Sequence, residues 1–145
     1  MSMLKLWTRL FRRFHVGPWR DGEVMFSRPR RQPLQELVSF WADNSLYEDI
    51  RHQVGSRDAS RFLRACLRLG LGLFRECPEL MQELDKRGRK ERSMSVWVDE
   101  GTYERLLIVS QGQKSQLIRA SVEFGLVHFQ VHPEHISMLD GGGRD

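Results

Sequence analysis

Two short stretches of the chain alternate apolar and polar side chains, which is the pattern of a β-strand with two different faces. They lie at 37–42 and 93–98. One face carries Val38, Phe40, Ala42, Met94, Val96 and Val98, and the other carries Leu37, Ser39, Trp41, Ser93, Ser95 and Trp97. We expect the first face to be buried and the second to meet solvent. A shift of one residue would instead bury the tryptophans, but it would expose Val96 and Val98 together.

Two helical patterns follow each of these stretches, separated by a turn. Each helix has a short polar residue at its expected start, where a side-chain oxygen can accept from a free backbone N–H. The expected caps of the four helices, in chain order, are Asp43, Asn44 or Ser45; Ser60; Asp99; and Ser115. The chain therefore reads twice as strand, helix, helix.

The two halves also repeat in detail. Ser-x-Trp-x-Asp at 39–43, followed by Tyr-Glu, returns 56 positions later at 95–99, and Ser-x-apolar-apolar-Arg-Ala at 60–65 returns 55 positions later at 115–120. Halves of about 45 residues are each marginal for an independent core, so the two halves need each other. Their strands can pair antiparallel about a two-fold axis. We predict a mostly α fold with a short antiparallel two-stranded ribbon, arranged as a pseudo-dimer within one chain.

The repeats divide the chain into five parts. They are a basic arm at 1–33, the first repeat at 34–79, a basic linker at 80–92, the second repeat at 93–136 and a flexible tail at 137–145. In the arm, 3–14 has the spacing of a basic amphipathic helix and the remainder reads as an irregular tether. That helix can pack on the protein itself or a partner, on a membrane surface, or on DNA.

Charge favours an anionic partner. The net charge is +4 and the isoelectric point is near 9.5. Residues 1–33 alone hold eight Lys/Arg against two acids. Nucleic acid and an anionic membrane surface are the candidates. The sequence offers no membrane span and no signal-peptide core, so we expect a cytoplasmic protein.

At this point the chain resembles the ribbon-helix-helix family of Arc and MetJ type. The resemblance rests on the alternating strands that end in Asp, the Tyr-Glu that follows each, and the Ser-x-apolar-apolar-Arg-Ala opening of each second helix. It covers about 37–79 and 93–134. A tandem form in one polypeptide, with a proline after each second helix, is similar to the TraY-type relaxosome accessory proteins of conjugative plasmids.

The resemblance implies a protein that places its ribbon in the major groove of double-stranded DNA. Its function would lie in conjugative DNA processing or transcription regulation. Its other partners would be DNA-processing or transfer proteins, and 3–14 could bind a membrane surface. One chain would act as a pseudo-dimer. Several chains could also bind DNA cooperatively.

The resemblance also implies two sets of DNA contacts. The base-facing residues would be Ser39, Trp41, Ser93, Ser95 and Trp97. The phosphate contacts would come from Arg57, Ser60, Arg61, Arg89, Lys90, Arg92, Lys114 and Ser115. The family's ribbon usually offers Arg, Lys, Asn or Gln to bases, whereas this one offers Ser and Trp, so direct readout should be modest. Exposed tryptophans are also typical of protein interfaces, which leaves a protein-interaction module without DNA binding as the alternative.

Two other signals have plainer explanations. Arg64 and Arg119 are expected to form structural ion pairs with acids such as Glu48 or Glu104, although DNA contact remains open. Cys66 and Cys77 read as buried, idle thiols.

The remaining chemistry points away from catalysis and metal binding. His128, His132 and His135 have helical spacing, but Pro133 breaks the helix between them, so we predict no metal site. The sequence has no phosphate loop, no Gly-x-Ser-x-Gly or Cys-x-x-Cys motif and no carboxylate cluster at a plausible site, and we predict a protein that is not an enzyme and needs no cofactor.

Overall fold

The computed structural model describes residues 19–20, 23–24, 33–55, 57–84 and 90–140. Its elements, in chain order, are β1 (Trp19–Arg20), β2 (Glu23–Val24), β3 (Leu34–Ala42), α2 (Asn44–Val54), α3 (Ala59–Glu76), the 3-10 helix η1 (Pro78–Glu83), β4 (Arg92–Asp99), α4 (Glu100–Ser110), α5 (Lys114–Val131) and α6 (His135–Leu139). The fold is mostly helical, and β3 and β4 form a short antiparallel sheet. This much of the predicted fold class is confirmed.

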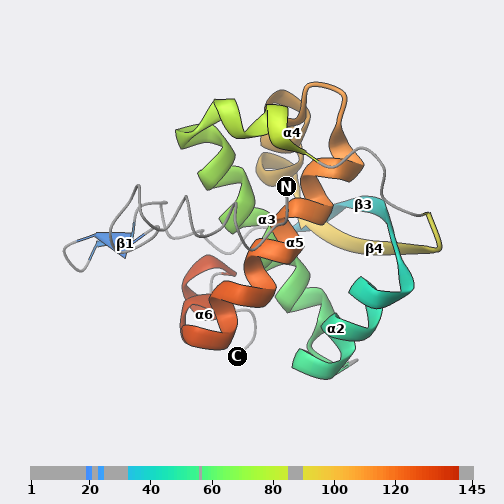
Figure 1. The fold of residues 1–145 in the computed structure, drawn as a ribbon. Helices are drawn as coiled ribbons and strands as arrows, with labels where there is room; N and C mark the ends of the chain where they lie inside the picture. The colour runs from blue at the N-terminus through green and yellow to red at the C-terminus, as the bar shows by residue number, and fades with distance from the viewer. Residues whose placement is uncertain (1–18, 21–22, 25–32, 56, 85–89, 141–145) are drawn as a thin grey trace.

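Strands β3 and β4 form the expected two-stranded ribbon. Ser39 lies opposite Ser95, and Val38 lies opposite Val96. The pairing is regular except at the start of β3, where the register shifts by one residue between Leu34 and Glu36. In Figure 1 the ribbon lies on the right, and the long helices α3 and α5 lie toward the middle.

The ribbon buries the face that the alternation predicts. Val38, Phe40, Ala42, Val96 and Val98 are each at most 3% exposed. Trp41 and Trp97 remain 42% and 50% exposed. The shifted register, which would have buried both tryptophans, is therefore wrong.

The first helix of each half is capped as the sequence predicts. Asp43 accepts through Oδ1 from the backbone N–H of Leu46 at 2.8 Å. Asp99 accepts through Oδ2 from the backbone N–H of Thr102 at 3.0 Å. Each bond satisfies one of the free amides at a helix start and contributes about 1 kcal/mol of stability.

The caps predicted for the long helices are wrong. Ser60 and Ser115 are each the second residue inside a helix, because α3 and α5 begin two residues earlier than caps at these serines require. The residues at the cap positions are Asp58 and Gln113, and neither side chain makes a cap hydrogen bond. The Ser115 hydroxyl instead accepts a hydrogen bond from the backbone N–H of Trp41.

The core lies between the ribbon and the two long helices. Four buried phenylalanines join α3 to α5 in two pairs, Phe62 with Phe129 and Phe74 with Phe124, each with ring centroids 5.8 Å apart. Burying a side chain of this size contributes about 1.5–3 kcal/mol. The α3–α5 contact is thus a main source of the stability that holds the two halves together.

Glycines allow α3 and α5 to approach closely. A Cβ placed on Gly70 would lie 1.8 Å from Ser121 Oγ, and one placed on Gly125 would lie 2.2 Å from Cys66 Sγ. No real Cβ tolerates such contacts. Each helix therefore presents a glycine to a small side chain of the other helix.

A buried ionic network ties the end of α6 to α3. Asp140, 7% exposed, accepts through Oδ1 from Arg64 Nε at 2.9 Å and from Arg68 Nη1 at 3.0 Å. Arg68 also donates from Nη2 to Asp99 Oδ1 at 2.7 Å. Burial alone would raise the pKa of Asp99, but hydrogen bonds from Thr102 and Arg68 outweigh it and lower that pKa to about 2.

This network corrects the ion pair expected at Arg64. Its acid is Asp140, and not Glu48 or Glu104. Glu48 and Glu104 belong to the repeated unit, whereas Asp140 lies beyond its second copy.

The network also corrects the start of the flexible tail. Residues 137–140 belong to the packed structure, since Leu139 is 1% exposed and α6 spans His135–Leu139. Residues 141–145 lie outside the described part of the chain.

The arm at 1–33 is described only in part. Within the segment expected to be irregular, β1 and β2 pair antiparallel, with Trp19 opposite Val24 and Arg20 opposite Glu23. The amphipathic helix predicted at 3–14 lies outside the described residues.

Candidate functional site

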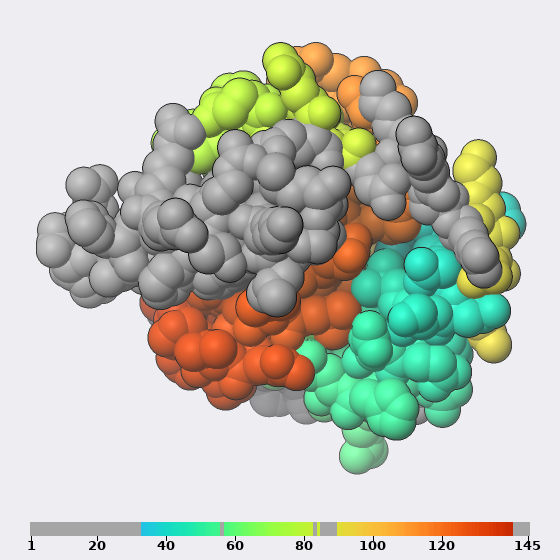
Figure 2. Space-filling model, viewed as in Figure 1, coloured from blue at the N-terminus to red at the C-terminus, as the bar shows by residue number. Residues whose placement is uncertain are grey.

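The exposed side of the β3–β4 ribbon is the strongest candidate for a functional surface. We call it the ribbon face, and it consists of Leu37, Ser39, Trp41, Ser93, Ser95 and Trp97. All six side chains are exposed, and none carries a charge. In Figure 2 the ribbon lies at the right-hand edge of the molecule, with β4 in yellow.

The two halves contribute to the ribbon face in a diagonal arrangement. Ser39 Oγ and Ser95 Oγ hydrogen-bond to each other at 2.8 Å in its centre. Leu37 lies opposite Trp97 on one side of this pair, and Trp41 lies opposite Ser93 on the other. The two indoles therefore lie on different strands, one on each side of the serine pair.

Each tryptophan backbone is bonded to a long helix from the other half. The backbone N–H of Trp41 donates to Ser115 Oγ, in the first turn of α5, at 3.1 Å. The backbone carbonyl of Trp97 accepts from Arg64 Nη1, in the second turn of α3, at 3.3 Å. The beginnings of both long helices are thus fixed beside the ribbon, where their free amides and dipoles favour anions.

The residues expected to contact phosphate lie in different environments. Arg57, Ser60 and Lys90 are exposed. Lys114 and Ser115 are half-buried at the start of α5. Arg89 lies outside the described residues.

The side chains of the other two predicted phosphate contacts donate hydrogen bonds to partners within the protein. Arg61 donates from Nη2 to Ser137 Oγ at 2.7 Å, and its side chain is 36% exposed. The guanidinium of Arg92 lies 4.1 Å from the ring centroid of Tyr47, and its Nε donates to Asn44 Oδ1 at 3.3 Å. Both arginines must leave these partners, or share them, to reach a phosphate.

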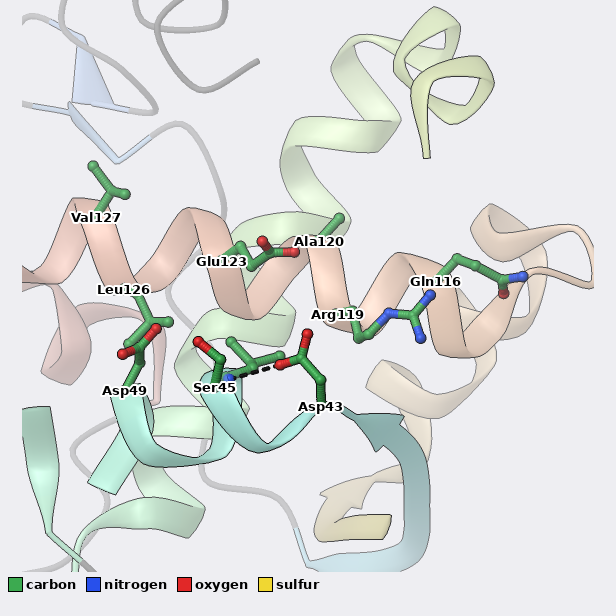
Figure 3. Close-up of a pocket in the computed structure, with 10 residues that line it drawn as sticks. Asp43, Ser45, Asp49, Gln116, Arg119, Ala120, Glu123, Leu126 and Val127 are labelled. Atoms are coloured by element: carbon green, nitrogen blue, oxygen red, sulfur yellow. Dashed lines mark hydrogen bonds between the residues drawn. The ribbon is translucent and has the colours of Figure 1, made fainter. Parts of the chain in front are cut away.

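A cavity of about 330 Å³ opens between α2 and α5, close to the end of β3 (Figure 3). Its charged lining is Asp43, Asp49, Glu123 and Arg119, three acids against one base. The Asp43 carboxylate is already engaged in capping α2. This lining does not suit a phosphate group, so the cavity adds nothing to an anion-binding surface.

The rings of His128, His132 and His135 lie close together at the junction of α5 and α6. The ring centroids of His128 and His135 are 5.1 Å apart, and those of His132 and His135 are 4.7 Å apart. Pro133 does break the helix, as expected, since α5 ends at Val131 and α6 begins at His135. The break turns the chain back so that the His135 ring lies beside those of His128 and His132. Burial, then His135 and His132, lower the pKa of His128 to about 3, and burial with His132 lowers the pKa of His135.

Both cysteines are buried and neither forms a disulfide, as expected. Burial raises the pKa of the Cys66 thiol well above its ordinary value, so it is a poor nucleophile. Its structural role is the contact with Gly125.

Comparisons with known proteins identify no family for this chain. The chain matches no protein-family model, no curated protein and no solved structure. Across the described residues, no helix combines the length and apolar character needed to cross a bilayer.

Proposed function

We propose that this chain is a tandem ribbon-helix-helix pseudo-dimer that binds double-stranded DNA and is not an enzyme. The order β3–α2–α3 is followed by β4–α4–α5, and the two strands pair about the Ser39–Ser95 contact. The close contacts between α3 and α5 support the same symmetry. Gly70 meets Ser121 and Gly125 meets Cys66, and the two pairs exchange under the 55-residue offset of the repeat.

The observation that carries the DNA proposal is an exposed two-stranded ribbon beside the beginnings of two long helices. The major groove of B-DNA is about 12 Å wide and admits a two-stranded β-ribbon. In that position the ribbon face would meet base edges, while the starts of α3 and α5 would meet the flanking phosphates.

The chemistry of the ribbon face indicates how it would read DNA. Serine hydroxyls accept from or donate to any base, and each indole offers one N–H together with a large apolar surface. Trp41 and Trp97 would contact thymine methyl groups, and the shape of the groove would supply further discrimination. Exposed Arg57 and Lys90 would add phosphate contacts, joined by Ser60 at the start of α3.

The two halves would read different sequences. Leu37 of the first half corresponds to Ser93 of the second, and both side chains lie on the ribbon face. We therefore propose an imperfectly palindromic site. Footprinting that reveals a strict palindrome protected by one chain would count against this.

We assign the protein to an accessory or regulatory role, in conjugative DNA processing or in transcription. The support is the resemblance of the tandem pattern to TraY-type proteins. Other DNA-processing or transfer proteins would be its further partners.

The test is a mobility shift on a pool of random-sequence duplexes at low and raised salt. We expect binding that weakens with a log–log slope of about −0.9 per phosphate neutralised. Trp41→Ala/Trp97→Ala should weaken binding about tenfold or more, because it removes the two large contacts of the ribbon face. The matched control is Leu107→Ala/Ile108→Ala, which truncates two exposed apolar residues of α4 that are not part of the ribbon face, 47% and 74% exposed, and should bind normally.

Two outcomes would overturn parts of the proposal. Absence of binding at low salt would end the DNA hypothesis. Binding by the Trp41→Ala/Trp97→Ala variant equal to that of the wild type would move the contact away from the ribbon.

One observation favours a second function, a protein-interaction module. The ribbon face has no Arg, Lys, Asn or Gln, its two central hydroxyls bond to each other, and its large side chains are Leu37, Trp41 and Trp97. Exposed aromatics of this kind are enriched at protein interfaces. A partner captured through the ribbon face with little salt dependence, together with no DNA shift, would support this function.

A further inference from the structure

The junction of α5 and α6 brings potential metal ligands together. Helix α5 ends at Val131, the chain turns at Pro133, and α6 begins at His135. The ligand atoms of His132, Glu134 and His135 all lie within 4.8 Å of one another. Among the described residues, this is the one group of three or more His, Cys, Asp or Glu side chains whose ligand atoms lie close enough to hold a metal ion.

We propose that His132, Glu134 and His135 bind one divalent transition-metal ion of the zinc class. The proposal is independent of DNA binding. Its ligands are two imidazoles and one carboxylate, a donor set that zinc accepts in sites with three protein ligands and one open position. Imidazole ligands favour Zn²⁺, Cu²⁺ or Ni²⁺ over Mg²⁺ or Ca²⁺, which prefer oxygen.

The spacing of the ligand atoms is close to that of a tetrahedral site. Glu134 Oε2 lies 3.4 Å from His132 Nδ1 and 3.6 Å from His135 Nε2. Two ligand atoms bound tetrahedrally to zinc at about 2.0–2.1 Å are separated by about 3.4 Å. The separation between the carboxylate oxygen and each ring nitrogen is therefore already close to that between two ligands of one zinc ion.

His128 serves as the outer partner of this site. Its Nε2 lies 2.9 Å from His135 Nδ1, and the residue is 2% exposed. Metal-ligating histidines almost always hydrogen-bond through their second ring nitrogen, which fixes ring orientation and tautomer. A His135 that donates from Nδ1 to His128 leaves the lone pair of Nε2 directed to the side where Glu134 lies.

One ring must turn for the metal to bind. His132 and His135 are nearly parallel, with 12° between their planes, whereas an ion must lie close to the plane of each ring that binds it. The side chain of His132 is 39% exposed and that of His135 is 13% exposed. His132 is therefore the ring that rotates, and metal binding breaks the histidine stack.

A metal at this junction would fix α6 against the end of α5. Helix α6 leads directly to Asp140, which bonds to Arg64 and Arg68 on α3. We therefore expect the metal to raise the thermal stability of the chain.

The test is titration of the full chain, without a polyhistidine tag, with Zn²⁺ in a calorimeter and with Co²⁺ by visible absorption. We expect one ion per chain and the intense d–d bands of tetrahedral Co²⁺. His132→Ala and Glu134→Gln change exposed side chains that the core does not need, and each should weaken Zn²⁺ binding about tenfold or more. The control is His52→Ala, which removes an exposed histidine of α2 and should leave binding unchanged.

The melting temperature gives a second measurement. Zn²⁺ should raise it in the wild type and in His52→Ala, and should not in His132→Ala or Glu134→Gln. No Zn²⁺ binding by the wild type, or equal affinity in all four proteins, would overturn the proposal. A Co²⁺ spectrum with only weak octahedral bands would overturn the tetrahedral geometry.

Discussion

The close approach of α3 and α5 predicts that Gly70→Ala destabilises the protein, although alanine is the better helix former. The new Cβ would lie 1.8 Å from Ser121 Oγ, 2.4 Å from Ser121 Cβ and 3.0 Å from Ser121 Cα. Rotation of the Ser121 side chain moves only its Oγ, so the contact with Cβ persists. The two helices must therefore separate.

The size of the effect follows from two opposing contributions. Carbon atoms in good contact lie about 3.5–4.0 Å apart, so the Cβ–Cβ distance is short by roughly 1 Å. Overpacking of this kind costs about 1–3 kcal/mol, and an overlap this severe belongs at the upper end. Replacing a helical glycine by alanine offsets about 1 kcal/mol. We expect a net loss of about 2 kcal/mol in the free energy of unfolding, and a melting temperature lower by roughly 5–10 °C.

Urea denaturation followed by far-UV circular dichroism measures this loss, and a double variant tests its cause. Gly70→Ala/Ser121→Gly moves the small residue to the other helix and should recover most of the stability. The coupling energy of the double-mutant cycle should be about 1–3 kcal/mol. A Gly70→Ala protein as stable as the wild type, or a double variant whose losses simply add, would refute the close helix contact.

The remaining predictions concern caps, charges and the core. Asp43→Ala should lower the free energy of unfolding by about 1 kcal/mol, because it removes the cap of α2; a neutral result by urea denaturation would contradict that role. Asp140→Ala should cost about 3–5 kcal/mol, because buried Arg68 loses one of its two carboxylates, and the melting temperature checks this. Phe124→Ala, at a fully buried site, should cost about 3–5 kcal/mol in the same assay. Because the pKa of Asp99 is lowered from 3.8 to about 2, its contribution, about 1–2 kcal/mol, is complete above pH 4–5 and lost as pH falls toward 2. Unfolding measured across this range should show a smaller pH dependence in Asp99→Asn.

The features that the sequence predicts correctly are local. Alternation at 37–42 and 93–98 gives the strands and their exposed tryptophans, because strand faces follow directly from residue parity. Asp43 and Asp99 are correct as caps, since a cap depends on residues three positions away.

The features that the sequence misses depend on distant parts of the chain. Nothing near Ser115 indicates that its hydroxyl accepts from Trp41 of the other half. Asp140 lies outside the repeated pattern, so the repeat offers no sign that it pairs with Arg64. The histidine cluster is the exception, because its members lie within eight consecutive residues. Pro133 interrupts the helix there, yet the spacing His-x-Glu-His around the proline is itself a usable local signal.

The bonds that join the ribbon and α6 to the long helices also determine when the chain can fold during its synthesis. Trp41 and Ser115 are 74 residues apart, and Arg64 and Asp140 are 76 apart. Since the ribosome delivers the N-terminal half first, α3 is made before α5 exists to cover its apolar side. Until the second half emerges, that side is available to chaperones or to other nascent chains. Ribosome-bound chains that end before α5 should therefore remain protease-sensitive, and protection should appear only once Asp140 has left the exit tunnel.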